Sequence, residues 1–137
     1  MGPVDLTPLG IRRQLVELMF SALPSIVLIV LGHGLAGFTV WQLTGDPAIL
    51  AATMVGIGIG AYRILLCVLF NRRSPNSDSL LELTRWTRLY GMGGVAYSLS
   101  LAWLTGISLY LAHVEGALLC ITVAMSYTVG MIIRVAV

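Results

Sequence analysis

The stretch "SIVLIVLGHGLAGFTVWQLTGDPAILAATMVGIGIG", residues 25–60, contains two long apolar segments joined by a short turn. Asp46 is the only Asp, Glu, Lys or Arg in these residues. "TGDP" has the composition of a tight turn, and Pro47 suits the first turn of the helix that follows. Each apolar segment approaches the ~20 residues that a helix needs to cross a bilayer. The stretch therefore predicts a helical hairpin inside a membrane.

The whole chain has the composition of a membrane protein. Of its 137 residues, 58% are hydrophobic and 10% are charged, whereas a soluble domain carries about 25% charged residues. Four apolar runs are present, at roughly 20–43, 48–70, 91–112 and 116–135. The sequence predicts one all-α transmembrane domain over residues 1–137, a compact bundle of four transmembrane helices.

The first run is too long for a cleaved signal peptide and lacks a small-x-small site after it. Pro24 is expected either to kink the first span or to mark where an N-terminal surface helix gives way to it.

Arginine, the only basic residue type apart from histidine, sets the expected topology. Most of the arginines lie before the first run, between the second and third runs, or at the end of the fourth: Arg12, Arg13, Arg72, Arg73, Arg85, Arg88 and Arg134. The loops "LTGDPA" and "AHVEG" contain none. Because positively charged loops stay in the cytoplasm, the sequence predicts a multi-pass protein of the bacterial inner membrane with both termini inside.

The segment before the third run predicts a short amphipathic helix at about residues 79–90 that runs into the third span. Ser79 and Glu82 have capping-box spacing, and Leu80, Leu83, Trp86, Leu89 and Tyr90 recur at helical spacing. We expect this helix to lie on the cytoplasmic membrane surface, with Trp86 and Tyr90 at headgroup level and Arg85 and Arg88 against anionic lipid. It is either a passive anchor or a part that moves with the third span.

Small residues at every fourth position predict close helix packing, because small side chains let helix backbones approach within lipid. The rows are Ala48, Ala52, Gly56 and Gly60 in the second span, Gly94, Ser98, Ala102 and Gly106 in the third, and Gly116, Cys120, Ala124 and Thr128 in the fourth. The sequence leaves open whether a row faces its own bundle or a neighbour, so a homodimer and a larger membrane complex are both expected partners beside the lipid. If Leu101, next to Ala102, faces lipid, its replacement by Ile should disturb the bundle less than that of Ala102.

Polar residues inside the spans are the candidate functional residues. His33 lies about mid-span, and His113 lies at the outer end of the third span, too far from His33 in depth to share a haem. We favour structural packing for His33 and an outer-surface contact with Glu115 for His113. Cys67 and Cys120 are interpreted as small apolar residues. Arg63 is the only cation well inside a span. It can snorkel to the cytoplasmic surface, which we favour, or bond across helices to a polar group such as Tyr127.

The sequence offers no catalytic residues. A proton-coupled exporter would need a carboxylate within the membrane, and none of the acidic residues lies deep in a span. No phosphate loop, nucleophile triad or metal-ligand cluster is present. We expect no enzymatic activity in these residues, no cofactor or metal, and no nucleic-acid partner.

Short motifs in residues 40–137 resemble the N-terminal multi-helix membrane region of bacterial diguanylate cyclases, the GGDEF-domain proteins, some of which also carry EAL domains. The resemblance rests on "TGDPAIL" with Arg63 later in the span, on "RWTRLYG" before the third span, and on "ITVAMSYTVGMIIRVAV" with Tyr127, Gly130 and Arg134. It implies the input region of a cyclic-di-GMP signalling protein, whose GGDEF signature is absent from these residues. The alternative is a small non-catalytic subunit packed against a photosynthetic or respiratory complex. Continuation of the reading frame into a GGDEF domain would distinguish the two.

Overall fold

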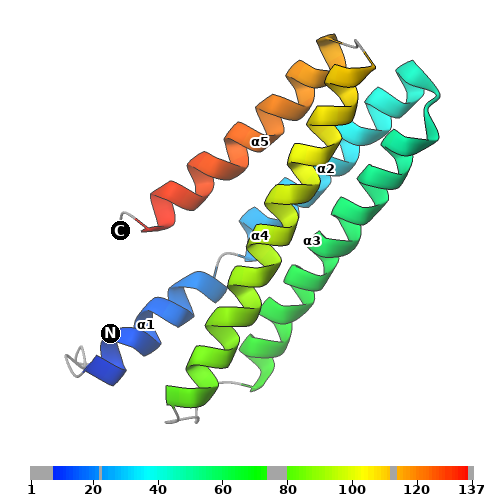
Figure 1. The fold of residues 1–137 in the computed structure, drawn as a ribbon. Helices are drawn as coiled ribbons and strands as arrows, with labels where there is room; N and C mark the ends of the chain where they lie inside the picture. Colours follow the sequence, from blue (N-terminus) through cyan, green and yellow to red (C-terminus); the bar gives the residue numbers. More distant parts are fainter. Residues whose placement is uncertain (1–7, 22, 74–79, 112–113, 136–137) are drawn as a thin grey trace.

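The computed structural model describes residues 8–21, 23–73, 80–111 and 114–135 as a set of five helices with no strand among them. They are α1 (Pro8–Phe20), α2 (Leu23–Thr44), α3 (Pro47–Arg73), α4 (Leu80–Tyr110) and α5 (Val114–Val135), shown in Figure 1. Within these residues, Gln14–Thr44, Pro47–Arg72 and Leu81–Tyr110 are long and apolar enough to cross a membrane, and Val114–Val129 is a shorter apolar helix. The prediction of an all-α membrane protein is confirmed at this level.

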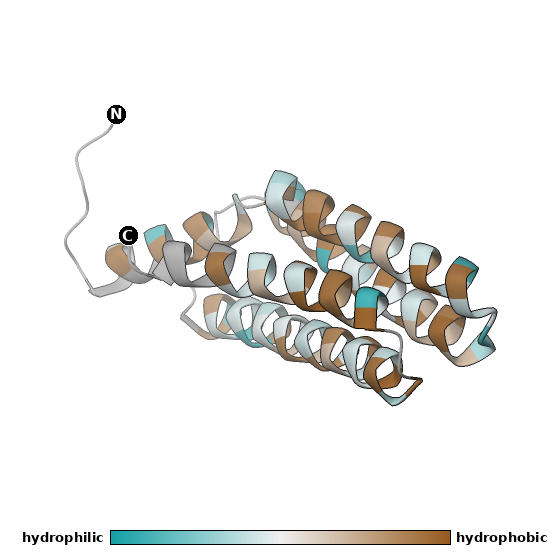
Figure 2. Cartoon of the chain, turned by 90° about the horizontal axis from the view of Figure 1, so that it is seen from above, coloured by the Kyte–Doolittle hydropathy of each residue, from teal (hydrophilic) through white to brown (hydrophobic). Residues whose placement is uncertain are grey.

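The helices α2 to α5 form a bundle in which chain neighbours run antiparallel. α2 packs against α3 and α5, and α4 packs against α3 and α5. Hydrophobic residues occur along every helix of the bundle, on outer as well as inner faces (Figure 2).

Hydroxyl groups on the helices form hydrogen bonds within their own helix: Thr39, Thr53, Thr105 and Ser108 each donate to the carbonyl four residues earlier. This arrangement suits lipid, where no water is present to bond a hydroxyl.

The turn between α2 and α3 forms as the sequence predicts. Gly45 has φ +66°, a left-handed conformation that glycine adopts without strain, and its N–H donates to the carbonyl of Trp41 at 2.7 Å. The carboxylate of Asp46 accepts from the N–H of Ala48 at 2.7 Å and so caps α3. Pro47 occupies the first helical position.

Glycines bring α2 and α3 into close contact. A Cβ added to Gly37 would collide with Thr53, one added to Gly56 would collide with His33, and one added to Gly60 would collide with Val30. Two of these glycines, Gly56 and Gly60, belong to the row of the second span. That part of the row therefore lies against α2 of the same chain.

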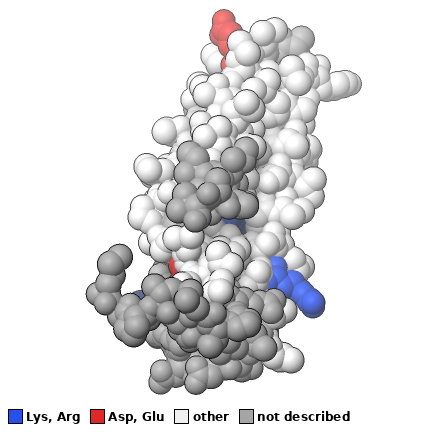
Figure 3. All heavy atoms as spheres, turned by 90° about the vertical axis from the view of Figure 1, so that its left-hand side faces the viewer, with Lys and Arg blue, Asp and Glu red and all other residues white. Residues whose placement is uncertain are grey.

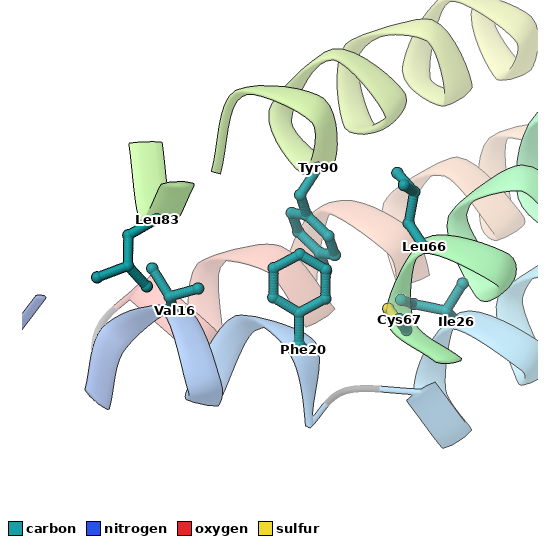
Figure 4. Packing of buried hydrophobic residues seen from close by; sticks show 7 residues of the cluster. All are labelled: Val16, Phe20, Ile26, Leu66, Cys67, Leu83 and Tyr90. Carbon is teal, nitrogen blue, oxygen red and sulfur yellow. The ribbon is translucent and has the colours of Figure 1, made fainter. Parts of the chain in front are cut away.

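An aromatic cluster joins α1 to the C-terminal part of α3 and the N-terminal part of α4. The structure agrees with the second alternative for Pro24, since α1 ends at Phe20 and α2 begins at Leu23. Phe20 stacks on Phe70 with ring centroids 4.0 Å apart, and Trp86 meets both rings edge-on. The buried residues of this cluster are Val16, Phe20, Ile26, Leu66, Cys67, Leu83 and Tyr90 (Figure 4).

Residues 80–90 form the first part of α4. The sequence predicts a helix over 79–90 that runs into the third span, and Leu80–Tyr110 is one continuous helix whose first turns run along the axis of α4 (Figure 1). Packing holds this segment to the bundle, because Leu83 and Tyr90 are buried in one cluster with residues of α1 and α3. Tyr90 was expected at headgroup level, but it is only 4% exposed and its ring packs in the protein core.

The small-residue row of the third span lies mostly on the outside of α4. Gly94 is buried, but Ser98, Ala102 and Gly106 are exposed. Leu101 does not face lipid, because it is 2% exposed and packs with Tyr97 and Tyr127. The core face of α4 is therefore its Tyr97–Leu101–Leu104 side, and the small row is free to meet another surface.

Candidate functional site

A buried arginine is the most unusual feature of the bundle. Arg63 lies ten residues before the end of α3, roughly 15 Å along the helix, and is 2% exposed. Its guanidinium points into the bundle toward α4 and α5, where it contacts tyrosines from both helices. The favoured prediction of snorkelling is therefore wrong, and the alternative bond to Tyr127 is present.

Three tyrosine rings surround this guanidinium. The Cζ atom of Arg63 lies 5.0 Å from the ring centroid of Tyr90, 6.0 Å from that of Tyr97 and 5.7 Å from that of Tyr127. A cation within about 6 Å of an aromatic face is attracted by the ring quadrupole, by about 2 kcal/mol or more once water is removed. The three rings therefore offset part of the cost of burying a charge. We call Arg63 with these tyrosines the arginine cage.

One hydroxyl connects three helices at the cage. Arg63 Nη1 donates to the hydroxyl of Tyr127 at 3.1 Å, and this hydroxyl donates to the backbone carbonyl of Gly94 at 3.4 Å. α5 is thus joined to α3 through a side chain and to α4 through the backbone. Neither Nε nor Nη2 of Arg63 has a hydrogen-bond partner among the described residues, so the bond to Tyr127 satisfies a large share of the needs of this guanidinium.

The glycines of "GMGG" make room for the cage. A Cβ at Gly93 would lie 3.0 Å from Cγ of Arg63, and a Cβ at Gly94 would lie 3.6 Å from the hydroxyl of Tyr127. The sequence analysis assigned Gly94 to helix packing and gave Gly93 and Tyr97 no role. Gly93 and Gly94 of α4 lie beside the space that Arg63 of α3 and Tyr127 of α5 occupy. A pair of adjacent glycines in a span, together with an arginine deep in the preceding span, was the sequence signal for this contact.

His33 lies on the α2 side of the same region. Its ring is fully buried over Gly56 and lies 5.6 Å from the ring of Tyr97, centroid to centroid. Tyr97 in turn donates to the carbonyl of Ile29 at 3.2 Å. Neither ring nitrogen of His33 bonds to a described residue. Arg63, Tyr97 and His33 therefore form a polar path from α3 through α4 to α2.

The other predicted residues lie outside the cage. Cys120 is buried with its sulfur 3.8 Å from Ser108 Oγ, Ala124 is half-buried and packs against the cluster of Tyr97, Leu101 and Tyr127, and Cys67 is buried in the cluster around Phe20. Arg85 and Arg88 are exposed near the start of α4, and Trp86 is half-buried. His113 lies outside the described residues, as do the surroundings of Gly130 and the side chain of Arg134.

The described arginines other than Arg63 lie toward the same end of the bundle. Asp46 and Glu115 lie at the starts of α3 and α5 at one end, whereas Arg72, Arg85 and Arg88 lie toward the other end, which also carries Glu82. On the face shown in Figure 3, the largest acidic patch lies at the upper end and the largest basic patch lies in the lower half. Among the described residues, no group of three or more His, Cys, Asp or Glu side chains could hold a metal ion.

The cage couples α3, α4 and α5. A single hydroxyl of α5 bonds a buried charge whose Nε and Nη2 have no partner among the described residues, so movement of α5 relative to α3 would leave this guanidinium with one more unpaired donor. Comparison with protein-family models, with curated proteins and with solved structures finds no match for this chain.

Proposed function

We propose that this chain is the membrane-embedded input region of a bacterial cyclic-di-GMP signalling protein, with both termini in the cytoplasm and a GGDEF domain attached after α5. The observation that carries the proposal is the bond between Arg63 and Tyr127. An ionisable residue within a membrane is a functional candidate by default, because its burial is costly. Here the buried charge of Arg63 is bonded to α5, the helix that leads to the C-terminus.

In this proposal α5 has two positions, one with the Arg63–Tyr127 bond and one without it. With the bond intact, Tyr127 is 6% exposed and α5 lies against α2 and α4. A displacement of α5 leaves Arg63 with a further unpaired donor in a dry environment, which is unfavourable by about 1–3 kcal/mol. A signal that offsets this amount within the membrane would move α5, and any domain attached to it, between two states.

The first test is the reading frame beyond Val137. Continuation into a GGDEF domain supports the proposal, and a stop codon overturns it. The second test is Tyr127→Phe in the protein with its cyclase domain, with Tyr110→Phe as control because Tyr110 is 88% exposed. Cyclic-di-GMP output per membrane-inserted protein should change for Tyr127→Phe alone. Equal output from both variants would remove the cage from the mechanism.

Topology provides a separate test of the orientation. Reporter fusions after Asp46 and after Glu115 should report the periplasm, and fusions after Asn76 and after Val137 should report the cytoplasm. A cytoplasmic report from the fusion after Asp46 would reverse the proposed orientation and place any attached cyclase away from its GTP.

An accessory or scaffold subunit of a larger membrane complex is the second candidate. The exposed row Ser98, Ala102 and Gly106 favours it, because small residues on an outer helix face allow another helix to approach closely. The same face would serve a homodimer. Ala102→Trp should abolish co-purification with a larger complex if the chain is such a subunit, whereas it should abolish only self-association if the chain is a dimeric input region.

A further inference from the structure

We propose that the outer face between α3 and α4 is a binding site for one anionic phospholipid, with the phosphate on Arg85 and Arg88 and an acyl chain in the groove that continues along α4. This inference is independent of the proposed function. It rests on two adjoining hollows, on two exposed guanidinium groups at one end of them, and on the chemistry of their walls.

The first hollow lies near the start of α4. It has a volume of about 520 Å³ and is lined by Leu66 and Leu69 of α3 and by Leu81, Glu82, Arg85, Trp86 and Leu89 of α4. A neighbouring hollow of about 580 Å³ is lined by Leu81, Thr84, Arg85 and Arg88. Because Leu81 and Arg85 line both, the two hollows adjoin, and together they place two guanidinium groups at the edge of an apolar wall.

The second part of the groove is almost entirely apolar. A hollow of about 450 Å³ is lined on α3 by Gly58 and Tyr62 and on α4 by Leu89, Met92 and Gly93, among others. Leu89 lines this hollow and the first one, so the wall is continuous from Arg85 onward. The volumes fall in the ~300–1,000 Å³ range of small-molecule sites.

The length of the groove fits one leaflet. Arg85 and Ala96, which also lines the apolar part, are separated by roughly 16 Å along the helix. Half of the ~30 Å hydrocarbon core is about 15 Å. A phosphate at Arg85 therefore places the acyl chain of the same lipid against Leu89, Met92 and Gly58, and the chain ends near the middle of the bilayer.

Charge selects the kind of lipid. Arg85 and Arg88 are exposed, and neither has an ion-pair partner among the described residues. Glu82, on the wall of the first hollow, is half-buried and is the carboxylate nearest to them in the chain. Two guanidinium groups against one carboxylate leave a net positive site, and guanidinium binds phosphate oxygens in a bidentate manner. A headgroup without a compensating cation, such as phosphatidylglycerol, is therefore preferred to phosphatidylcholine.

The glycine at position 58 allows the acyl part to be tested separately. A Cβ at Gly58 meets nothing within 4 Å, so Gly58→Leu fills the groove without a collision in the protein. Gly91 is the matched control, since it is exposed on α4, meets nothing within 4 Å and lies outside the groove. For the headgroup, Arg85→Gln with Arg88→Gln is compared with Arg72→Gln, an exposed arginine that lines none of these hollows.

The experiment measures lipid retained by the purified full chain. Protein is reconstituted in nanodiscs of phosphatidylcholine with a minor fraction of phosphatidylglycerol, and bound lipid is counted by native mass spectrometry. One phosphatidylglycerol per chain should be retained. The double arginine variant should weaken binding by about 5- to 30-fold, since each arginine near anionic lipid contributes about 1 kcal/mol. Gly58→Leu should also lose the lipid, while Gly91→Leu and Arg72→Gln should retain it.

Two results would overturn the proposal. Equal retention of phosphatidylglycerol by the groove variants and their controls, with all variants helical by circular dichroism, would show that no site exists here. Inorganic phosphate that displaces the lipid at equal concentration, or phosphatidylcholine retained as well as phosphatidylglycerol, would show that the groove does not select an anionic phospholipid.

Discussion

Replacing Tyr127 by Phe removes one oxygen atom from the arginine cage and keeps the ring that faces the guanidinium. The hydroxyl of Tyr127 accepts from Arg63 Nη1 at 3.1 Å and donates to the carbonyl of Gly94 at 3.4 Å. Hydrogen bonds to a charged group contribute about 1.5–3 kcal/mol, whereas side-chain bonds between membrane helices average about 0.6 and reach about 1.7 kcal/mol. Arg63 is 2% exposed, so water cannot easily replace the lost oxygen. We expect the free energy of unfolding to fall by about 1.5 kcal/mol.

The assay is reversible unfolding of the purified chain in mixed micelles titrated with dodecyl sulfate and followed by circular dichroism. Tyr110→Phe is the control, because this side chain is 88% exposed and should leave the unfolding free energy unchanged. A double-mutant cycle with Arg63→Met isolates the pair. A coupling energy near zero, or equal shifts for the two Tyr→Phe variants, would refute the reasoning.

Three further predictions concern packing. Gly56→Ala should lower the free energy of unfolding by about 1–3 kcal/mol because its Cβ collides with the ring of His33, whereas Gly32→Ala, which meets nothing within 4 Å, should be neutral or slightly stabilising in the same titration. Leu101→Ala should cost about 2–5 kcal/mol and Leu99→Ala far less, since their exposures are 2% and 65%; equal losses would contradict the assigned core face of α4. Cys120, at 1% exposure, should resist a membrane-permeant maleimide until the bundle is unfolded, as measured by mass; rapid labelling of native protein would contradict its burial.

The positions of the helices follow from the sequence more directly than the faces they bury. The "TGDP" turn and the apolar runs predict α2, α3 and α5 and the end of α4 within a few residues, because hydropathy and turn chemistry are local properties. The start of α4 at Leu80 lies outside the apolar run at 91–112, because the polar segment before that run is also helical. Which face of a helix meets protein is not local. In a membrane the lipid-facing and protein-facing sides are both apolar, so nothing in the pattern separates the buried Leu101 from the exposed Leu99.

The same reasoning explains the outcome at the candidate site. An arginine late in the second span has two physically sound destinations, the surface and a polar partner, and its own residue type does not decide between them. The decision comes from Tyr90, Tyr97 and Tyr127, which lie on two other helices and meet only after the bundle forms. Tyr90 was predicted at the membrane surface for a similar reason, since tyrosine is common both at a membrane–water interface and in a protein core.

The contacts of the aromatic cluster around Phe20 can form only in a fixed order as the chain is synthesised. Phe20 of α1 packs against Trp86 of α4, which leaves the ribosome ~66 residues later. At about 5–20 residues per second, Trp86 follows Phe20 by roughly 3–13 s, whereas Phe70 of α3, which stacks on Phe20, lies only ~50 residues after it and follows by roughly 2.5–10 s. Until α3 is made, the ring of Phe20 lacks the aromatic partners that it has in the folded bundle. The contacts of α1 are therefore completed in two stages, first by α3 and then by α4.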